Sequence, residues 1–173
     1  MRNGTREGGK VSSKSQDLDR LGEEITEQAA HINAATCRWL LLVASFDRQD
    51  GWMSWGCRSC AHWLSWRCGV SEMTARDQVR VARRMPELPG IQESFARGEL
   101  SYSQVRALTR VATPETERDL VQLARHATVA QLEVIVRAYR GVLRTELGDG
   151  RDDEHGRRFV RCQHDYDGSL LIT

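Results

Sequence analysis

The 173-residue sequence has no apolar run long enough to cross a membrane and no recognisable secretion signal. Its longest strongly apolar run extends from Trp39 to Ala44, far below the roughly 20 residues that a membrane span needs. The first residues, MRNGTREGGKVSSKSQ, lack the apolar segment that a signal peptide carries. We therefore expect a cytoplasmic protein without membrane segments, in which the five cysteines are reduced thiols.

The motifs of common catalytic and nucleotide-binding sites are also missing. There is no Walker loop, no GxSxG and no dinucleotide-binding glycine fingerprint. His62 and His126 fall in predicted helices, where a lone histidine is more often packed or solvated than catalytic. The sequence therefore predicts no catalytic residues and no cofactor, and we expect no enzymatic activity from this chain.

A zinc site is weighed against a structural role for the cysteines. Cys57 and Cys60 form a CxxC pair, and Cys68 and the segment 162–164 contain further candidate ligands. However, a second CxxC or an HxxxH pair, typical of structural zinc sites, is missing. Cys60 and Cys68 share one helical face with Leu64, as small buried apolar side chains do. We expect no metal site.

Lysine is scarce, since the only two lysines, Lys10 and Lys14, lie near the N-terminus. The net charge is +1, but residues 52–146 contain fourteen arginines against ten acidic residues. Such a modest basic excess is compatible with a polyanionic partner, yet it does not predict one by itself.

A long helix is predicted from about Asp17 to Arg48, after a disordered tail over residues 1–16. Apolar side chains recur along this helix at alternating steps of three and four, which is the pattern of a heptad seam. Such a seam can pair two chains or pack against the chain's own helices. We expect intramolecular packing for its second half, from Trp39 to Phe46, and leave open a homodimer through its first half. The first half contributes Leu18, Leu21, Ile25 and Ile32, and the remaining seam positions are Gln28, Ala35, Trp39, Leu42 and Phe46.

Residues 56–85 predict two short helices that meet at a corner, which suits a helix-turn-helix. The first ends near Cys68, a turn follows at Gly69, and Ser71 caps the second. The second helix is apolar on one side and carries arginines on the other, a stripe that can contact phosphates and base edges. The alternative is a solvated face whose arginines pair with nearby acids. The predicted DNA-contacting residues are Arg76, Arg80, Arg83 and Arg84, with Arg137, Arg140 and Arg144 as a secondary stripe.

Further helix-start signals complete an all-α multi-helix bundle over residues 17–147. Helices are predicted over 90–97, 102–112 and 114–126 and after Thr128, the second and fourth behind capping boxes. The composition then changes to a turn-rich linker over 148–157. Residues 158–173 predict an incomplete C-terminal β-hairpin, as the start of a truncated β-containing module.

Several phrases of the sequence resemble one bacterial family. SCAHWLSWRCG, VRVARRMPELP, GELSYSQVRALTRVA and DYDGSLLI are similar to the family called domain of unknown function 222, or 13E12 repeat family. The resemblance covers about Leu18 to Thr173. Members typically carry this helical region before an HNH endonuclease domain, so the resemblance implies a DNA-associated module of a nuclease-related protein. The HNH catalytic residues are missing here, and we expect a non-catalytic chain that is truncated before that domain or acts alone.

Two functions follow from these patterns. The first is a DNA-associated helical module with double-stranded DNA as its partner. The second is a protein-interaction or oligomerisation module, built on the heptad seam, that makes no contact with nucleic acid.

Overall fold

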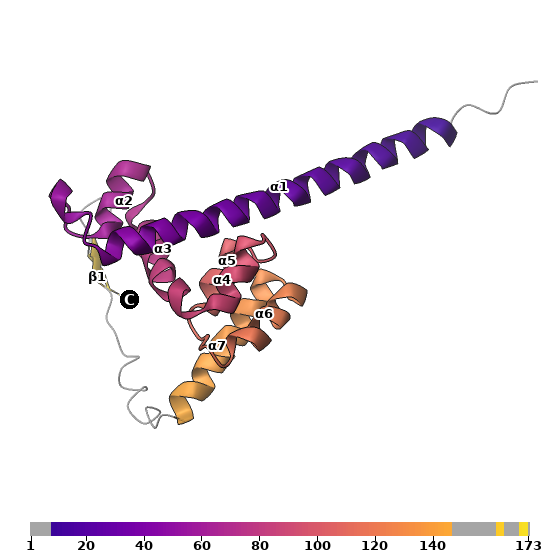
Figure 1. Ribbon diagram of the computed structural model, residues 1–173. Coiled ribbons are helices and arrows are strands. Elements are labelled where there is room, and N and C mark those ends of the chain that lie inside the picture. The colour runs from indigo at the N-terminus through magenta and orange to yellow at the C-terminus, as the bar shows by residue number, and fades with distance from the viewer. Residues whose placement is uncertain (1–7, 147–161, 165–169, 173) are drawn as a thin grey trace, which may run out of the picture. The chain divides into compact units, whose positions relative to one another are not determined.

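The computed structural model describes residues 8–146, 162–164 and 170–172 (Figure 1). The chain divides into two compact units, Met1–Val134 and Ile135–Thr173. The first unit is all-α, which confirms the predicted fold class for this part of the chain. Its elements are α1 (Gly8–Arg48), η1 (Met53–Trp55), α2 (Cys60–Cys68), α3 (Glu72–Arg84), η2 (Met85–Glu87), α4 (Pro89–Ala96), α5 (Tyr102–Leu108), α6 (Glu117–His126) and the beginning of α7 (Val129–Glu146).

The helix α1 is longer than the sequence predicted. It contains 41 residues and begins at Gly8, so the prediction of a disordered tail through residue 16 is wrong for residues 8–16. Once a helix has nucleated, each further residue adds one hydrogen bond at little cost, so a polar segment can extend a stable helix. Its predicted end at Arg48 is confirmed.

The second half of α1 packs against the body of the first unit, but by a different face from the predicted seam. Cys37 and Leu40 are fully buried, and Ala44 is 5% exposed. In contrast, Leu42 of the seam is 69% exposed. The prediction that this segment packs intramolecularly is correct, whereas the predicted face is wrong. Because the segment is apolar on more than one side, periodicity alone could not select the buried face.

The predicted corner between two short helices is present. Gly69 follows α2 in the left-handed region, with φ +68°. The Ser71 hydroxyl then accepts a hydrogen bond of 3.1 Å from the Thr74 amide and caps α3. The buried face of α3 consists of Ala75, Val79, Val81 and Ala82.

The helices after α3 follow their predicted order with shifted ends. The capping boxes of α5 and α7 are formed, with Gln104 and Gln131 accepting from the amides of Ser101 and Thr128. The predicted end of α5 near residue 112 is too late, since the helix ends at Leu108. The predicted start of α6 at residue 114 is too early, because residues 114–116 form a turn.

A buried carboxylate fixes the N-terminus of α4. The residue before this helix, Leu88, has no side chain that could cap it. Instead the Glu117 carboxylate, on the distant helix α6, accepts hydrogen bonds of 2.9 Å from the Gly90 amide and 3.1 Å from the Ile91 amide. Glu117 is only 7% exposed, and it satisfies one partly buried and one buried amide that the helix itself cannot pair.

The Glu117→Ala variant is expected to lose about 2 kcal/mol of unfolding free energy, because the buried Ile91 amide and the partly buried Gly90 amide lose their acceptor. Denaturant unfolding monitored by circular dichroism measures this loss. The matched control is Glu115→Ala, at an exposed neighbouring acid, which should change stability by less than about 0.5 kcal/mol. Equal effects of the two variants would contradict the capping role of Glu117.

In the second unit the structure describes the rest of α7 and two short strands. Strand β1 (Cys162–His164) pairs antiparallel with β2 (Leu170–Ile172), and Gln163 lies opposite Leu171. The whole of the predicted linker over 148–157, and most of the predicted hairpin over 158–173, lie outside the described residues. The hairpin as the start of a β-containing module therefore stays a prediction.

Candidate functional site

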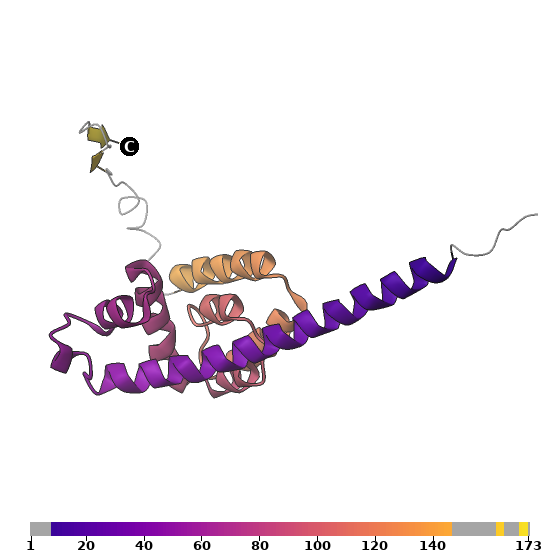
Figure 2. The same ribbon diagram turned by 90° about the horizontal axis from the view of Figure 1, so that it is seen from above.

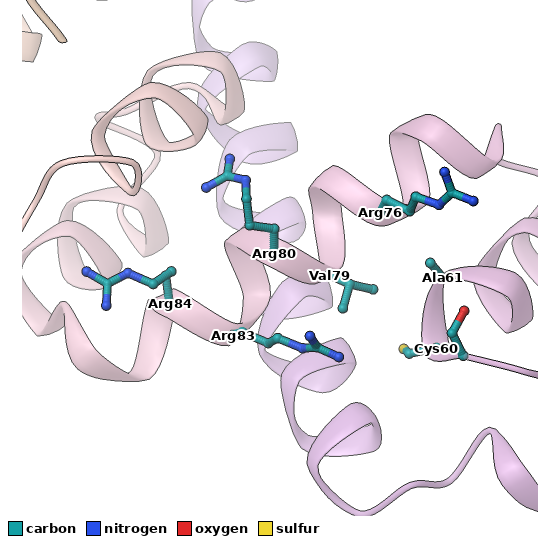
Figure 3. Close-up of a pocket in the computed structure, with 8 residues that line it drawn as sticks. Cys60, Ala61, Arg76, Val79, Arg80, Arg83 and Arg84 are labelled. Atoms are coloured by element: carbon teal, nitrogen blue, oxygen red, sulfur yellow. The ribbon is translucent and has the colours of Figure 1, made fainter. Parts of the chain in front are cut away.

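The four arginines of α3 do not form one outward ridge. Figure 3 shows that they diverge: Arg76 and Arg83 point toward the side of α2, where Cys60 lies, while Arg80 and Arg84 point elsewhere. Together they line part of an open hollow of about 520 Å³. The apolar side of α3 fixes this arrangement, because its burial leaves the arginines only the flanks of the helix.

Two of these arginines connect α3 to other parts of the first unit. Arg83 makes a two-pronged contact with Asp47 at the end of α1, with N–O distances of 2.7 and 3.1 Å. The Asp47 side chain is only 9% exposed, so this carboxylate depends on Arg83 for compensation of its charge. Arg84 pairs with Glu87 and donates to the Ala112 carbonyl at 2.7 Å.

Arg80 is used within the fold as well. Its guanidinium donates to Asp77 at 2.9 Å, to the Thr109 hydroxyl at 3.2 Å and to the Arg106 carbonyl at 3.1 Å. These contacts hold the end of α5 against α3. These three hydrogen bonds occupy three of the five guanidinium N–H donors and leave two for any further acceptor.

Arg76 completes the pattern, since it pairs with Glu72 one turn earlier at 2.5 Å. Each α3 arginine therefore has a carboxylate partner, which neutralises the stripe. The predicted cationic ridge is wrong in this respect, and the alternative of paired arginines is correct. Three of the partner acids were visible in the sequence at helical spacing, whereas Asp47, 36 positions away from Arg83, was not.

The Arg83→Ala variant is expected to lose about 1 kcal/mol of unfolding free energy, because Asp47 is left nearly buried and unpaired. Arg76→Ala serves as the matched control. Its pair with Glu72 is solvent-exposed within one helix and contributes less than about 0.5 kcal/mol. Urea unfolding of both variants makes the comparison, and a larger loss for Arg76→Ala would contradict the assignment of Arg83 as a structural link.

The arginines of the predicted secondary stripe make fewer contacts with carboxylates than the α3 arginines do, within the described residues. Arg137 and Arg140 are exposed, and neither pairs with a carboxylate within the part of the chain that the structure describes. The side chain of Arg144 lies outside the described residues, so this part of the prediction is not tested. Two free cations three positions apart on α7 are available to an anionic partner.

A pocket beside α3 that several charged side chains line was not predicted from the sequence. It has a volume of about 510 Å³ and includes Arg80, Tyr102, Arg106 and the exposed Arg110 in its lining. The Tyr102 hydroxyl and the Arg106 Nε atom are buried there without a hydrogen-bond partner among the described residues. Burial raises the pKa of Tyr102 to about 12, so its hydroxyl stays protonated at neutral pH.

The cysteines do not assemble a metal site within the described residues, where no three His, Cys, Asp or Glu side chains gather. Cys60 is buried, as its helical face predicted, whereas Cys68 on the same face is exposed, so the prediction is wrong for Cys68. Burial, followed by the charge of Asp47, raises the pKa of the Cys60 thiol to about 11. Its sulfur therefore stays protonated at neutral pH, where thiolate chemistry would need the anion.

The first half of the heptad seam of α1 is unpartnered within the described residues. All residues from 15 to 29 are exposed, and Figures 1 and 2 show this part of α1 extending beyond the neighbouring helices α2 to α6. The four large apolar side chains of the seam's first half are between 50% and 64% exposed. These are Leu18, Leu21, Ile25 and Ile32.

An apolar groove continues the seam at its C-terminal end. It has a volume of about 430 Å³ and lies between α1 and α2. Phe46 and Trp63 line it, with ring centroids 4.5 Å apart. Trp39, Leu42 and Leu64 also line it. Because Trp39, Leu42 and Phe46 belong to both the seam and the groove, the groove adjoins the C-terminal end of the seam.

These features define an all-α first unit with an exposed amphipathic helix, α1, whose apolar stripe is unpartnered over its first half within the described residues. The chain belongs to the family described as domain of unknown function (DUF222), whose model matches residues 20–165. No curated protein and no solved structure matches the chain. None of the described helices combines the length and the apolar character that a bilayer-crossing segment requires.

Proposed function

We propose that this protein is an assembly module in which α1 of one chain pairs with α1 of a second copy. The exposure of the whole first half of the heptad seam carries this proposal. Water solvates apolar side chains unfavourably, and each large aliphatic side chain gains about 1.5–3 kcal/mol when it is fully buried. Four such side chains at heptad spacing match the requirements of a coiled coil.

The length of the unsupported part of α1 favours the same function. In proteins, most helical stability comes from packing of an apolar face rather than from intrinsic propensity. Residues 15–29 are exposed throughout, so the apolar face of this part of α1 lacks such packing within the described part of the chain. A second copy of the seam would supply the missing packing surface.

Light scattering of the full chain over a concentration series tests this function. We expect a mass twice that of the 19.7 kDa chain at high concentration and a single-chain mass after dilution. A chain that begins at Ala29 retains the core residues Cys37 and Leu40 and should be monomeric throughout. A single-chain mass for the full chain up to about 100 µM would contradict the proposal.

Association with double-stranded DNA is a second candidate, and one observation favours it. Arg137 and Arg140 are exposed and lack a carboxylate partner within the described residues. In this proposal the chain acts as a non-catalytic, DNA-associated relative of HNH endonucleases, and these two arginines contact phosphates. The α3 arginines, being paired, contribute less.

Duplex binding measured by fluorescence anisotropy at several salt concentrations tests the second candidate. We expect binding that weakens steeply with salt, and a flatter slope for Arg137→Ala combined with Arg140→Ala. Arg76→Ala combined with Arg83→Ala should leave the slope nearly unchanged. Absence of binding at low salt would remove this candidate and leave the assembly function intact.

A further inference from the structure

Ionisable side chains follow one flank of the α1 seam in an ordered way. Each heptad of the seam has two core positions, and the residue immediately before the first of them lies on this flank. These residues are Asp17 and Glu24 in the first half of the seam, and His31 and Arg38 in the second half. All four side chains are exposed. The flank is therefore acidic toward the N-terminus and basic toward the C-terminus of the seam.

These charges have little compensation inside the chain. Asp17 and Glu24 each approach only Arg20, at 3.6 and 3.8 Å, in solvent-exposed contacts that contribute little. Arg38 has no carboxylate partner within the described part of the chain.

The opposite flank of the seam has no charge. The residue immediately after the second core position of each heptad lies on this opposite flank. These residues are Gly22, Ala29, Thr36 and Val43. In a parallel pair of helices each charged flank would face this uncharged flank of the other copy. In an antiparallel pair the two charged flanks face each other, so that acidic and basic halves meet.

On the basis of the assembly function proposed above, we propose that the two α1 helices pair antiparallel. Asp17 of one copy lies opposite Arg38 of the second copy, and Glu24 lies opposite His31. Because the pair is symmetric, each of these contacts occurs twice.

The same register places the core residues favourably. Leu18 of one copy lies opposite Leu42 of the second, and Leu21 lies opposite Trp39. The N-terminal leucines of each copy thereby reach the apolar groove at the C-terminal end of the other seam, which Trp39 and Leu42 line. In a parallel pair, N-terminal leucines would meet each other and leave both grooves unfilled by the seam.

The polar seam residue, Gln28, can be accommodated in the core of the antiparallel pair. Gln28 of each copy falls in one of the two central layers, opposite Ile32 of the other copy. Four residues separate the two layers, about 6 Å along the helix, so the two Gln28 side chains are within reach of a mutual hydrogen bond.

A charge-swap series on the full chain tests the antiparallel register. At low salt, Arg38→Glu and Asp17→Arg should each weaken dimerisation about tenfold, because each turns two attractive contacts into repulsive ones. The combination of both changes should restore the dimer. The control, Asp19→Arg, adds the same charge away from the charged flank and should have little effect.

Cross-linking gives an independent readout that does not depend on affinity. The Arg38→Lys variant introduces an amine that a carbodiimide can join to a carboxylate at contact distance. In a mixture of ¹⁵N-labelled and unlabelled chains, mass spectrometry should identify links between position 38 of one copy and Asp17 of the other.

The outcomes separate this inference from the assembly function. A dimeric chain without rescue in the double variant, and without the link to Asp17, would overturn the antiparallel register while the assembly function stands. A monomeric wild-type chain would overturn both. Rescue together with the link would support both.

Discussion

The Ile25→Asp variant is expected to be monomeric at concentrations at which the wild-type chain is dimeric. Ile25 is 62% exposed in the single chain and lies in the middle of the proposed interface. Each dimer contains two copies of this position, and burial of an unpaired carboxylate opposes association strongly. We expect the dissociation constant to rise at least about a hundredfold, measured by sedimentation equilibrium.

The control for this variant is Thr26→Asp, which places the same charge one residue further along, off the seam and at an exposed position. It should retain the dimer. Circular dichroism should show that only Ile25→Asp lowers the helical signal, because the first half of α1 loses its packing partner. Equal weakening by both variants would contradict the role of the seam.

The Gly98→Ala variant is expected to destabilise the first unit by about 3 kcal/mol and to lower the melting temperature by roughly 10 °C. Gly98 ends α4 with φ +78°, a left-handed conformation that side chains rarely adopt. In addition, a β-carbon there would lie 2.5 Å from the Ala30 carbonyl oxygen of α1. The added methyl group would therefore push α1 away from the turn after α4.

The Gly69→Ala variant separates the cost of the left-handed backbone conformation from the cost of the close contact with α1. Gly69 has a similar left-handed φ of +68°, but no atom lies within 4 Å of a β-carbon built there. This variant should lose only about 1 kcal/mol, the cost of the backbone conformation alone. Similar losses for the two variants in thermal unfolding would show that the close approach of α1 to Gly98 does not matter for stability.

The helix order could be predicted from the sequence because its start and stop signals are local. Ser71 and the capping boxes at Ser101 and Thr128 specify helix starts through contacts within four residues. The shifted ends of α5 and α6 arise where such signals are weaker. Thr113 and Pro114 look like a helix start, yet the α-helix begins only at Glu117.

The carboxylate partners of the α3 arginines could be predicted only in part. The pairs of Arg76, Arg80 and Arg84 involve acids three or four residues away, so they were available as an alternative. The Arg83–Asp47 contact depends on how α1 packs against α3, which no local spacing reveals.

The buried face of α1 also required the tertiary structure. In the second half of the helix, apolar residues occur on several sides, and the side with Cys37 and Leu40 is the one that is buried against the other helices of the first unit. Leu42 of the heptad seam then stays exposed, so a side chain that was expected in the core belongs to a candidate interface. The Glu117 cap on α4 was likewise invisible, because its donors at Gly90 and Ile91 belong to another helix.

Hydrogen exchange of the α1 amides as a function of protein concentration tests the central claim most directly. If two seams pair, the amides of residues 15–29 should be protected at high concentration and exchange quickly after dilution below the dissociation constant. Amides in the packed second half, such as that of Leu40, should exchange slowly at both concentrations. Equal exchange of residues 15–29 at both concentrations would contradict assembly through α1.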